Sequence, residues 1–338
     1  MKAALRLLVL ALAAALFAWF VDEAGPGEIL ATFSKLGARS VLVILPYALV
    51  YACDTLGWHF AFAGTTRPRL RYWLEFKLRM AGEAVNNIVP SAMIGGEPVK
   101  VYLAGKHGVS TLAAAQSVVV AKTTMTLAQV VFIALGALAA THTLAAGSPA
   151  HRAMLITTAL AAAVVVALFW LQRRGMFTGL LDLARACHVR VQALESRESH
   201  LRELDETIRT FYRDDRARFA LSTGFHLVGW IVGFVEILLV SHLVGVPLHW
   251  TQAFAIEAFA AVAKGLGAFM PGSIGVQESG ILLLFRLFGL PDALGVSYAI
   301  LRRGRELVWV GLGGAFLFSE ETSVRSLAEH VRAQESDG

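Results

Sequence analysis

The chain alternates between long apolar runs and short segments of polar and charged residues. Its long runs reach about 20 residues, the length of helix that crosses the roughly 30 Å hydrocarbon core of a bilayer. This pattern predicts an all-α polytopic membrane protein with about six transmembrane helices. The predicted spans cover residues 4–21, 41–63, 112–140, 153–172, 219–245 and 293–318.

Two further apolar stretches, at about 74–106 and 251–288, are interrupted by helix-breaking residues. The first contains NNIVPSAMIGGEPVK from Asn86 to Lys100, and the second contains FMPGSIGVQESG from Phe269 to Gly280. A break in a helix at membrane depth is tolerated only where protein or a wet cavity covers it. We therefore predict two re-entrant helical hairpins, with breaks at Pro90, Gly95, Gly96, Pro271, Gly272 and Gly275.

The distribution of basic residues sets the expected orientation, because Lys and Arg concentrate on the cytoplasmic side. Lys2 and Arg6 precede the first span, and the basic segment TRPRLRYWLEFKLR follows the second. Both termini are expected in the cytoplasm. The first hairpin should then enter from the cytoplasm, and the second should enter from outside.

The opposed hairpins indicate an inverted repeat. A shift of 181 residues superposes Pro90 on Pro271, Glu97 on Glu278 and Lys122 on Arg303. Inverted repeats with broken helices at their interface are common in secondary transporters. The expected division is a first repeat over 1–140, a second over 141–320 and a cytoplasmic tail over 321–338.

The segment 173–218 is the only sizeable soluble connector that the pattern predicts. Within it, apolar side chains form one helical stripe and charged ones fill the opposite face. Two interpretations stay open: an amphipathic helix on the inner leaflet, or a solvated connector between the repeats. The stripe consists of Leu201, Leu204, Ile208 and Phe211.

Composition agrees with a membrane protein and excludes several other classes. Hydrophobic residues form 56% of the chain and charged residues 16%, with a mean hydropathy of +0.61; soluble domains have about 45–50% and about 25%. Basic flanks account for the net charge of +5, so no nucleic-acid partner is expected. Cys53 and Cys187 suggest no disulfide, and His59, His226, His242 and His249 lack metal-ligand spacing. No cofactor or metal is expected, and no ATP-binding loop is present in the sequence.

Charged side chains inside a bilayer cost about 2.5–3.5 kcal/mol each on insertion scales, so they usually pair or line a cavity. We expect Glu97, Lys122, Glu278 and Arg303 to converge on one central cavity. Arg302 and Arg303 have the three-to-four spacing to Glu306 of a same-face helical pair. Two interpretations stay open: these groups receive a lipid phosphate, or they only lock the hairpins. The candidate substrate-binding residues are Asn86, Asn87, Glu97, Lys100, Lys122, Lys264, Glu278, Arg302, Arg303 and Glu306, with Glu83, Glu257 and Gln277 as further polar residues.

The segment PGSIG around Ser273 is one residue away from a Gly-x-Ser-x-Gly nucleophile elbow. Pro271 replaces the first glycine, and no strand precedes it. No catalytic residue is therefore expected.

The segments NNIVPSAMIGGEPVKVYL and PGSIGVQESG resemble the two signature regions of the lysylphosphatidylglycerol synthase transmembrane family. That family includes the flippase domain of the multiple peptide resistance factor and stand-alone proteins encoded beside hopanoid and glycolipid genes. The resemblance covers about residues 5–320. It departs from the family's pattern at Lys100, where an arginine is usual nearby, and at AKTTMTL, where an acid–arginine pair is usual.

The resemblance implies a non-enzymatic flippase in the bacterial inner membrane. Its cargo would be an amphiphilic phospho-, glyco- or hopanoid-type lipid, and its partners would be membrane lipids. Two alternatives stay open. One is a non-transporting scaffold that recruits a lipid-modifying enzyme, and the other is a membrane-embedded transferase that uses the buried acids.

Overall fold

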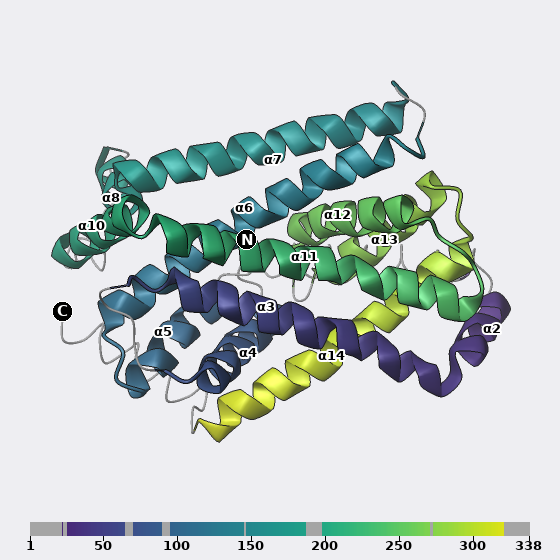
Figure 1. Cartoon of the computed structure of the whole chain (residues 1–338), viewed down its shortest axis with the longest axis horizontal. Helices are drawn as coiled ribbons and strands as arrows, with labels where there is room; N and C mark the ends of the chain where they lie inside the picture. Colours follow the sequence, from purple (N-terminus) through teal and green to yellow (C-terminus); the bar gives the residue numbers. More distant parts are fainter. Residues whose placement is uncertain are drawn as a thin grey trace.

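The computed structural model describes residues 22, 26–64, 70–89, 95–144, 147–186, 198–270 and 273–320, and every element in these ranges is a helix (Figure 1). The predicted first span at 4–21, the tail at 321–338 and the breaks Pro90, Pro271 and Gly272 lie outside these ranges. The elements are α2 (Pro26–Leu36), the 3-10 helix η1 (Gly37–Ile44), α3 (Leu45–Ala61), α4 (Tyr72–Ile88), α5 (Gly96–Lys106), α6 (Thr111–Ala140), α7 (Pro149–Arg174), α8 (Met176–Ala186), α10 (Glu198–Asp214), α11 (Arg216–Val244), α12 (Trp250–Leu266), α13 (Val276–Leu287) and α14 (Asp292–Ser319).

Within the described residues, four helical stretches are long and apolar enough to cross a membrane: Ile29–Ala61, Thr111–Ala140, Pro149–Arg174 and Arg216–Val244. They correspond to four of the predicted spans. The first starts earlier than expected, because α2 and η1 occupy much of 22–40, where we expected a loop. α14 has 28 residues, but its charged middle keeps it out of this apolar set, and its crossing stays a prediction.

The two interrupted stretches each form a pair of helices in contact, α4 with α5 and α12 with α13. α4 packs against α14, the last helix of the second half, and α12 packs against α6, the last helix of the first half. α3 and α11, which precede the hairpins, form the most extensive contact between helices. An inverted repeat requires this reciprocal arrangement, and the repeat itself stays a prediction.

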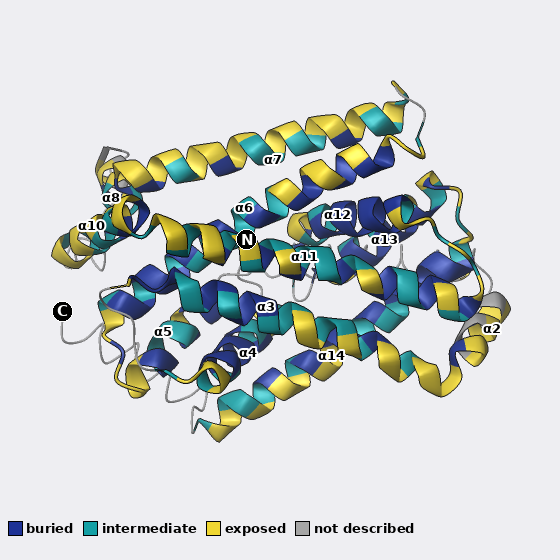
Figure 2. Cartoon of the chain, viewed as in Figure 1, coloured by how far each residue is buried: buried dark blue, intermediate teal, exposed yellow. Residues whose placement is uncertain are grey.

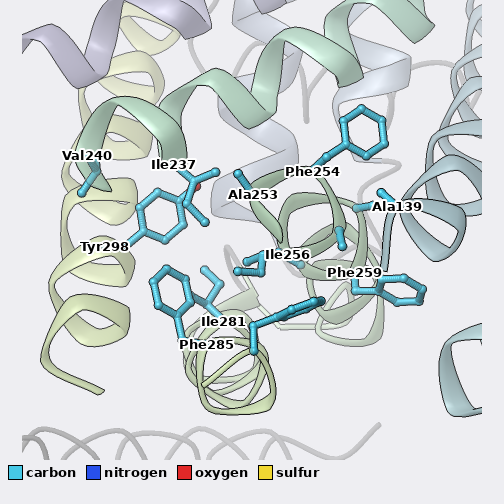
Figure 3. Packing of buried hydrophobic residues seen from close by; sticks show 14 of the residues in the cluster. Ala139, Ile237, Val240, Ala253, Phe254, Ile256, Phe259, Ile281, Phe285 and Tyr298 are labelled. Carbon is cyan, nitrogen blue, oxygen red and sulfur yellow. The ribbon is translucent and has the colours of Figure 1, made fainter. Parts of the chain in front are cut away.

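The core divides between the two halves. Side chains of α6, α11, α12, α13 and α14 form the larger buried cluster, and Figure 3 shows Tyr298, Phe285 and Ile281 meeting Ile237 and Ile256 within it. A second cluster, around Trp58, Leu78 and Leu103, joins α3 to α6. α7 differs: Figure 2 shows it mostly exposed along its length, and lipid would cover such an apolar surface.

The connector between the repeats folds against the protein. Ile208 and Phe211 of α10 are buried in the cluster around Trp58, and Leu204 packs against it. Most of the predicted apolar stripe therefore faces protein, which favours the interpretation as a connector between the repeats. Asp205, also buried, accepts hydrogen bonds from the backbone N–H groups of Phe177 and Thr178 at 3.2 and 2.9 Å. It thereby satisfies free donors at the start of α8.

Candidate functional site between the two halves

Two neighbouring cavities lie among the helices of both halves. The larger has a volume of about 200 Å³ and is lined from α3, α4, α6, α11, α12 and α14. The smaller has a volume of about 30 Å³. Arg79, Glu83 and Lys122 line both of them. The other charged or titratable residues are Tyr47, Tyr51, Asp54, Glu257, Lys264 and Arg302 in the larger, and Glu97, Lys100 and His226 in the smaller.

A buried trio joins α3, α4 and α11 beside the cavities. Arg79 Nη2 donates to Asp54 Oδ2 at 2.7 Å, and His226 Nδ1 lies 2.9 Å from Asp54 Oδ1. Arg79 is 4% exposed and His226 only 1%. Arg79 was expected at the cytoplasmic mouth of the first hairpin. It is instead a buried counter-ion, because Asp54 on the neighbouring helix compensates the cost of removing its charge from water.

Glu97 connects the start of α5 to the cavity. It pairs with Lys100 at 2.8 Å and, more loosely, with Lys122 at 3.8 Å. Asn86 donates to Glu97 at 3.4 Å and accepts a hydrogen bond from the backbone N–H of Gly96 at 2.7 Å. Asn86 therefore ties the end of α4 to the beginning of α5. Among the described residues, Asn87 hydrogen-bonds to Glu83, one turn back on α4, and it lines neither cavity.

The second half carries its own charged network on α14. Arg302 Nη1 donates to Glu257 Oε2 at 2.6 Å, and the hydroxyls of Tyr298 and Tyr47 donate to the same carboxylate at 3.2 and 3.5 Å. Arg305 lies 3.2 Å from Glu236, another fully buried acid. These contacts join α14 to α3, α11 and α12, so the network belongs to the interface of the two halves.

Glu306 and Glu278 connect α14 to the second hairpin. Glu306 accepts from Gln277 at 3.1 Å and pairs with Arg303 at 2.9 Å and Lys264 at 3.4 Å. Glu278 pairs with Arg303 and also accepts from the Gly275 backbone N–H at 2.6 Å. The pairs expected from spacing, Glu97 with Lys122, Glu278 with Arg303 and Arg303 with Glu306, are therefore close in space.

The expectation of one central cavity lined by four groups is wrong in part. Lys122 lines both cavities and Glu97 lines the smaller, but Glu278 and Arg303 line neither. Glu278 is held at the first turn of α13 by the Gly275 N–H, and Arg303 follows it. Ser273, the serine of the PGSIG segment, donates to the Lys264 carbonyl oxygen at 2.9 Å and so closes the turn between α12 and α13.

Sequence reasoning missed several residues of this site. Asp54 and Glu236 are single acids inside apolar runs, and such isolated charges could have marked them as candidates. Arg79 was hidden among basic residues that resemble a cytoplasmic flank. Tyr47, Tyr51 and His226 carry no comparable signal, since aromatic and histidine residues occur throughout the chain. No group of three or more His, Cys, Asp or Glu side chains in the described ranges is placed to hold a metal ion.

Comparison with known proteins agrees with this architecture. The chain is 22% identical over 296 residues to a UPF0104 membrane protein of the archaeon Methanothermobacter thermautotrophicus, covering 82% of this chain and 84% of that protein. The model of the family described as the lysylphosphatidylglycerol synthase TM region matches residues 6–314. Together with the apolar helices, this match identifies an integral membrane protein related to lipid flippase domains. The chain belongs to the lysylphosphatidylglycerol synthase transmembrane region family.

Proposed function

We propose that this protein moves an amphiphilic lipid from one leaflet of the bacterial inner membrane to the other, without chemical conversion of that lipid. The observation that carries the proposal is the cavity of about 200 Å³ at the interface of the two halves. A non-transporting scaffold would need no cavity with charged side chains in its walls at this position. Both halves contribute charged side chains to its walls, so a movement of one half against the other would change its shape and its access.

The size and chemistry of the cavity limit what it would hold. A volume of about 200 Å³ would hold a few water molecules or a compact polar head group, while acyl chains stay in the bilayer. Arg79, Lys122, Lys264 and Arg302 offer cationic donors to a phosphate, and Asp54, Glu83 and Glu257 keep the empty cavity close to neutral. Such a mixed wall lets a charged head group leave water without facing hydrocarbon.

The test is a leaflet-accessibility assay on purified protein in liposomes. Fluorescent phospho-, glyco- and hopanoid-type lipids are placed in both leaflets, and a membrane-impermeant quencher reports how fast inner-leaflet probe becomes accessible. We expect faster exchange than in protein-free liposomes for at least one head group. Equal rates for phospho-, glyco- and hopanoid-type probes, all at the protein-free level, would contradict the proposal.

A matched pair of variants on α11 tests whether the cavity itself is the route. Gly233 lines the cavity, and a Cβ atom there would lie 3.6 Å from Glu257 Oε1, so Gly233→Leu would extend into the cavity. Gly224, on the same helix, has open space around its Cβ position. We expect Gly233→Leu to slow lipid exchange and Gly224→Leu to leave it unchanged. Equal rates in two folded variants would remove the cavity from the pathway.

A further inference from the structure

Where α3 contacts α11, His226 packs beside Gly57 of α3, and Asp54 packs beside Gly229 of α11. A Cβ atom on Gly57 would lie 2.5 Å from His226 Nε2, and one on Gly229 would lie 3.2 Å from Asp54 Oδ1. On each helix the glycine follows the polar side chain by three residues: Gly57 follows Asp54, and Gly229 follows His226. The polar side chain of one helix packs against the glycine of the other. The contact of α3 with α11, the most extensive between any two helices of the described residues, is thus built around one acid–imidazole pair.

This packing fixes the protonation state of the imidazole. Arg79 holds Asp54 as an ionised acceptor, so His226 Nδ1 carries the proton and donates it to Asp54 at 2.9 Å. Nε2 is buried and has no hydrogen-bond partner among the described residues. A second proton, on Nε2, would create a buried N–H donor that has no acceptor among the described residues in this arrangement.

The charges around His226 are balanced before that proton arrives. Asp54 lies on α3, Arg79 and Glu83 on α4, Glu97 and Lys100 on α5, and Lys122 on α6. Three are acids and three are bases, so a protonated His226 leaves this group with one uncompensated positive charge. The larger cavity shares Arg79, Glu83 and Lys122 with this group, so the excess charge would favour an anion there.

We propose that His226 is a proton-binding site that couples lipid movement to proton movement, an inference that rests on the proposed transport function. Water in the smaller cavity, whose volume of about 30 Å³ exceeds the minimum for one molecule, brings the proton to Nε2. The protonated ring of His226 must move away from Gly57 to reach a hydrogen-bond acceptor. This movement separates α3 from α11. The charge of the ring also draws an anionic head group into the larger cavity. By thermodynamic linkage, a bound anion raises the proton affinity of His226 by the same factor.

The conformational step is tested without any lipid substrate. Spin labels at Leu49 of α3 and Val228 of α11, both exposed, report the distance between the helices in detergent micelles, in a Cys53→Ala, Cys187→Ala background. We expect the distance distribution to shift between pH 8 and pH 5. His226→Gln, which cannot titrate, should abolish the shift. His242→Gln, at an exposed histidine on the same helix, should preserve it.

A second measurement decides the matter if His226→Gln fails to fold. Nuclear magnetic resonance of histidine-labelled wild-type protein should show one buried ring that is protonated on Nδ1 at pH 8. That ring should gain its second proton over the same pH range as the distance shift. A shift that occurs while the buried ring stays neutral would overturn the proposal. A ring that titrates without any shift would overturn it equally.

Transport is then measured with fluorescent phosphatidylglycerol in liposomes of phosphatidylethanolamine and phosphatidylglycerol, with and without an imposed pH gradient. A gradient should accelerate exchange at least threefold in wild-type protein and in His242→Gln, but not in His226→Gln. If lipid exchange is faster than in protein-free liposomes but does not depend on the pH gradient or on His226, proton coupling is wrong and the transport function stands. A pH-dependent distance shift without exchange of any lipid would sink the transport function while the proton site stands.

Discussion

At the residue scale, the protein buries an unusual number of charges and compensates them locally. Arg79 with Asp54, Arg302 with Glu257 and Arg305 with Glu236 are pairs in which both side chains are almost inaccessible. Removal of one partner from such a pair leaves an uncompensated charge, which typically costs about 3–5 kcal/mol. A substitution that removes one of these charges therefore lowers stability, and a loss of activity in that variant does not by itself show a functional role.

Asp54→Asn tests this cost directly. It removes the counter-ion of Arg79 and replaces one of the two carboxylate oxygens that accept from Arg79 and His226 with an NH2 donor, so we expect a loss of about 3–5 kcal/mol in the free energy of unfolding. Asp214→Asn is the control, because Asp214 pairs with Arg213 on an exposed surface, and we expect little change. Thermal unfolding in detergent measures both, and equal stability of the two variants would show that the buried trio contributes nothing.

Charge-balanced double variants separate function from stability. Glu278→Gln with Arg303→Gln, and Glu97→Gln with Lys122→Gln, each remove an acid–base pair that the structure shows in contact. We expect both proteins to fold. The Glu97/Lys122 variant should lose lipid exchange, since that pair lines the cavities. The Glu278/Arg303 variant should also lose lipid exchange, because its pair connects α13 of the second hairpin to α14. If both double variants exchange lipid in liposomes at the wild-type rate, the four residues have only a structural role.

The sequence could predict some of these pairs and not others, for a physical reason. Glu278 with Arg303 and Arg303 with Glu306 follow from spacing along one hairpin and one helix. Asp54 and His226 are 172 residues apart, and only the packing of α3 on α11 brings them together. A pair that depends on tertiary structure leaves no periodic signal, so sequence reasoning found the charged hairpins but not the trio beside them.

At the element scale, glycines set how closely the helices of each hairpin approach. A Cβ atom on Gly96 would lie 1.9 Å from the carbonyl oxygen of Gly82 on α4, a clash with backbone that cannot move alone. Gly275 meets a requirement of backbone conformation. It precedes α13 with a φ of +81°, and its N–H donates to Glu278, so a positive φ favours glycine there.

Gly96→Ala compared with Gly105→Ala tests the close approach. Both glycines lie on α5, but a Cβ on Gly105 meets nothing within 4 Å. We expect Gly96→Ala to cost about 1–3 kcal/mol in the free energy of unfolding, as overpacking does, and Gly105→Ala to be neutral or slightly stabilising. Thermal unfolding measures the difference. Two equally stable proteins would show that α4 and α5 can separate freely.

Gly275→Leu tests the turn before α13. A branched side chain disfavours positive φ, so we expect lower folded yield and slower lipid exchange. Gly224→Leu is again the control, because Gly224 lies in α11 with open space around its Cβ position and lines neither cavity. Yields are compared by size-exclusion chromatography after membrane extraction, and normal yield and exchange in Gly275→Leu would argue that the turn tolerates other conformations.

At the scale of the whole molecule, the reciprocal packing of α4 on α14 and α12 on α6 agrees with two halves of opposite orientation. The order and type of most helices could be predicted because apolar length and helix breakers are local properties. The helix over Pro26–Leu36 and the docking of α10 were not predicted, since both depend on contacts with other elements.

Cysteine labelling tests the orientation. In a background without Cys53 and Cys187, a cysteine at position 107, after the first hairpin, should react with reagent from the cytoplasmic side. A cysteine at position 291, after the second, should react from outside. Impermeant maleimide applied to spheroplasts and to inverted vesicles distinguishes the sides. If both positions report the same side, the inverted repeat is wrong.

The charged middle of α14 has a consequence for biosynthesis. Arg302, Arg303, Arg305 and Glu306 would make this segment a poor substrate for lateral release from the translocon, because each charge opposes insertion by a few kcal/mol. Its counter-charges, Glu236, Glu257 and Glu278, lie on α11, α12 and α13, which the ribosome makes first. α14 therefore depends on helices already in the bilayer. A substitution that removes Glu236 of α11 or Glu257 of α12 would prevent α14 from inserting into the membrane and would expose it to membrane proteases.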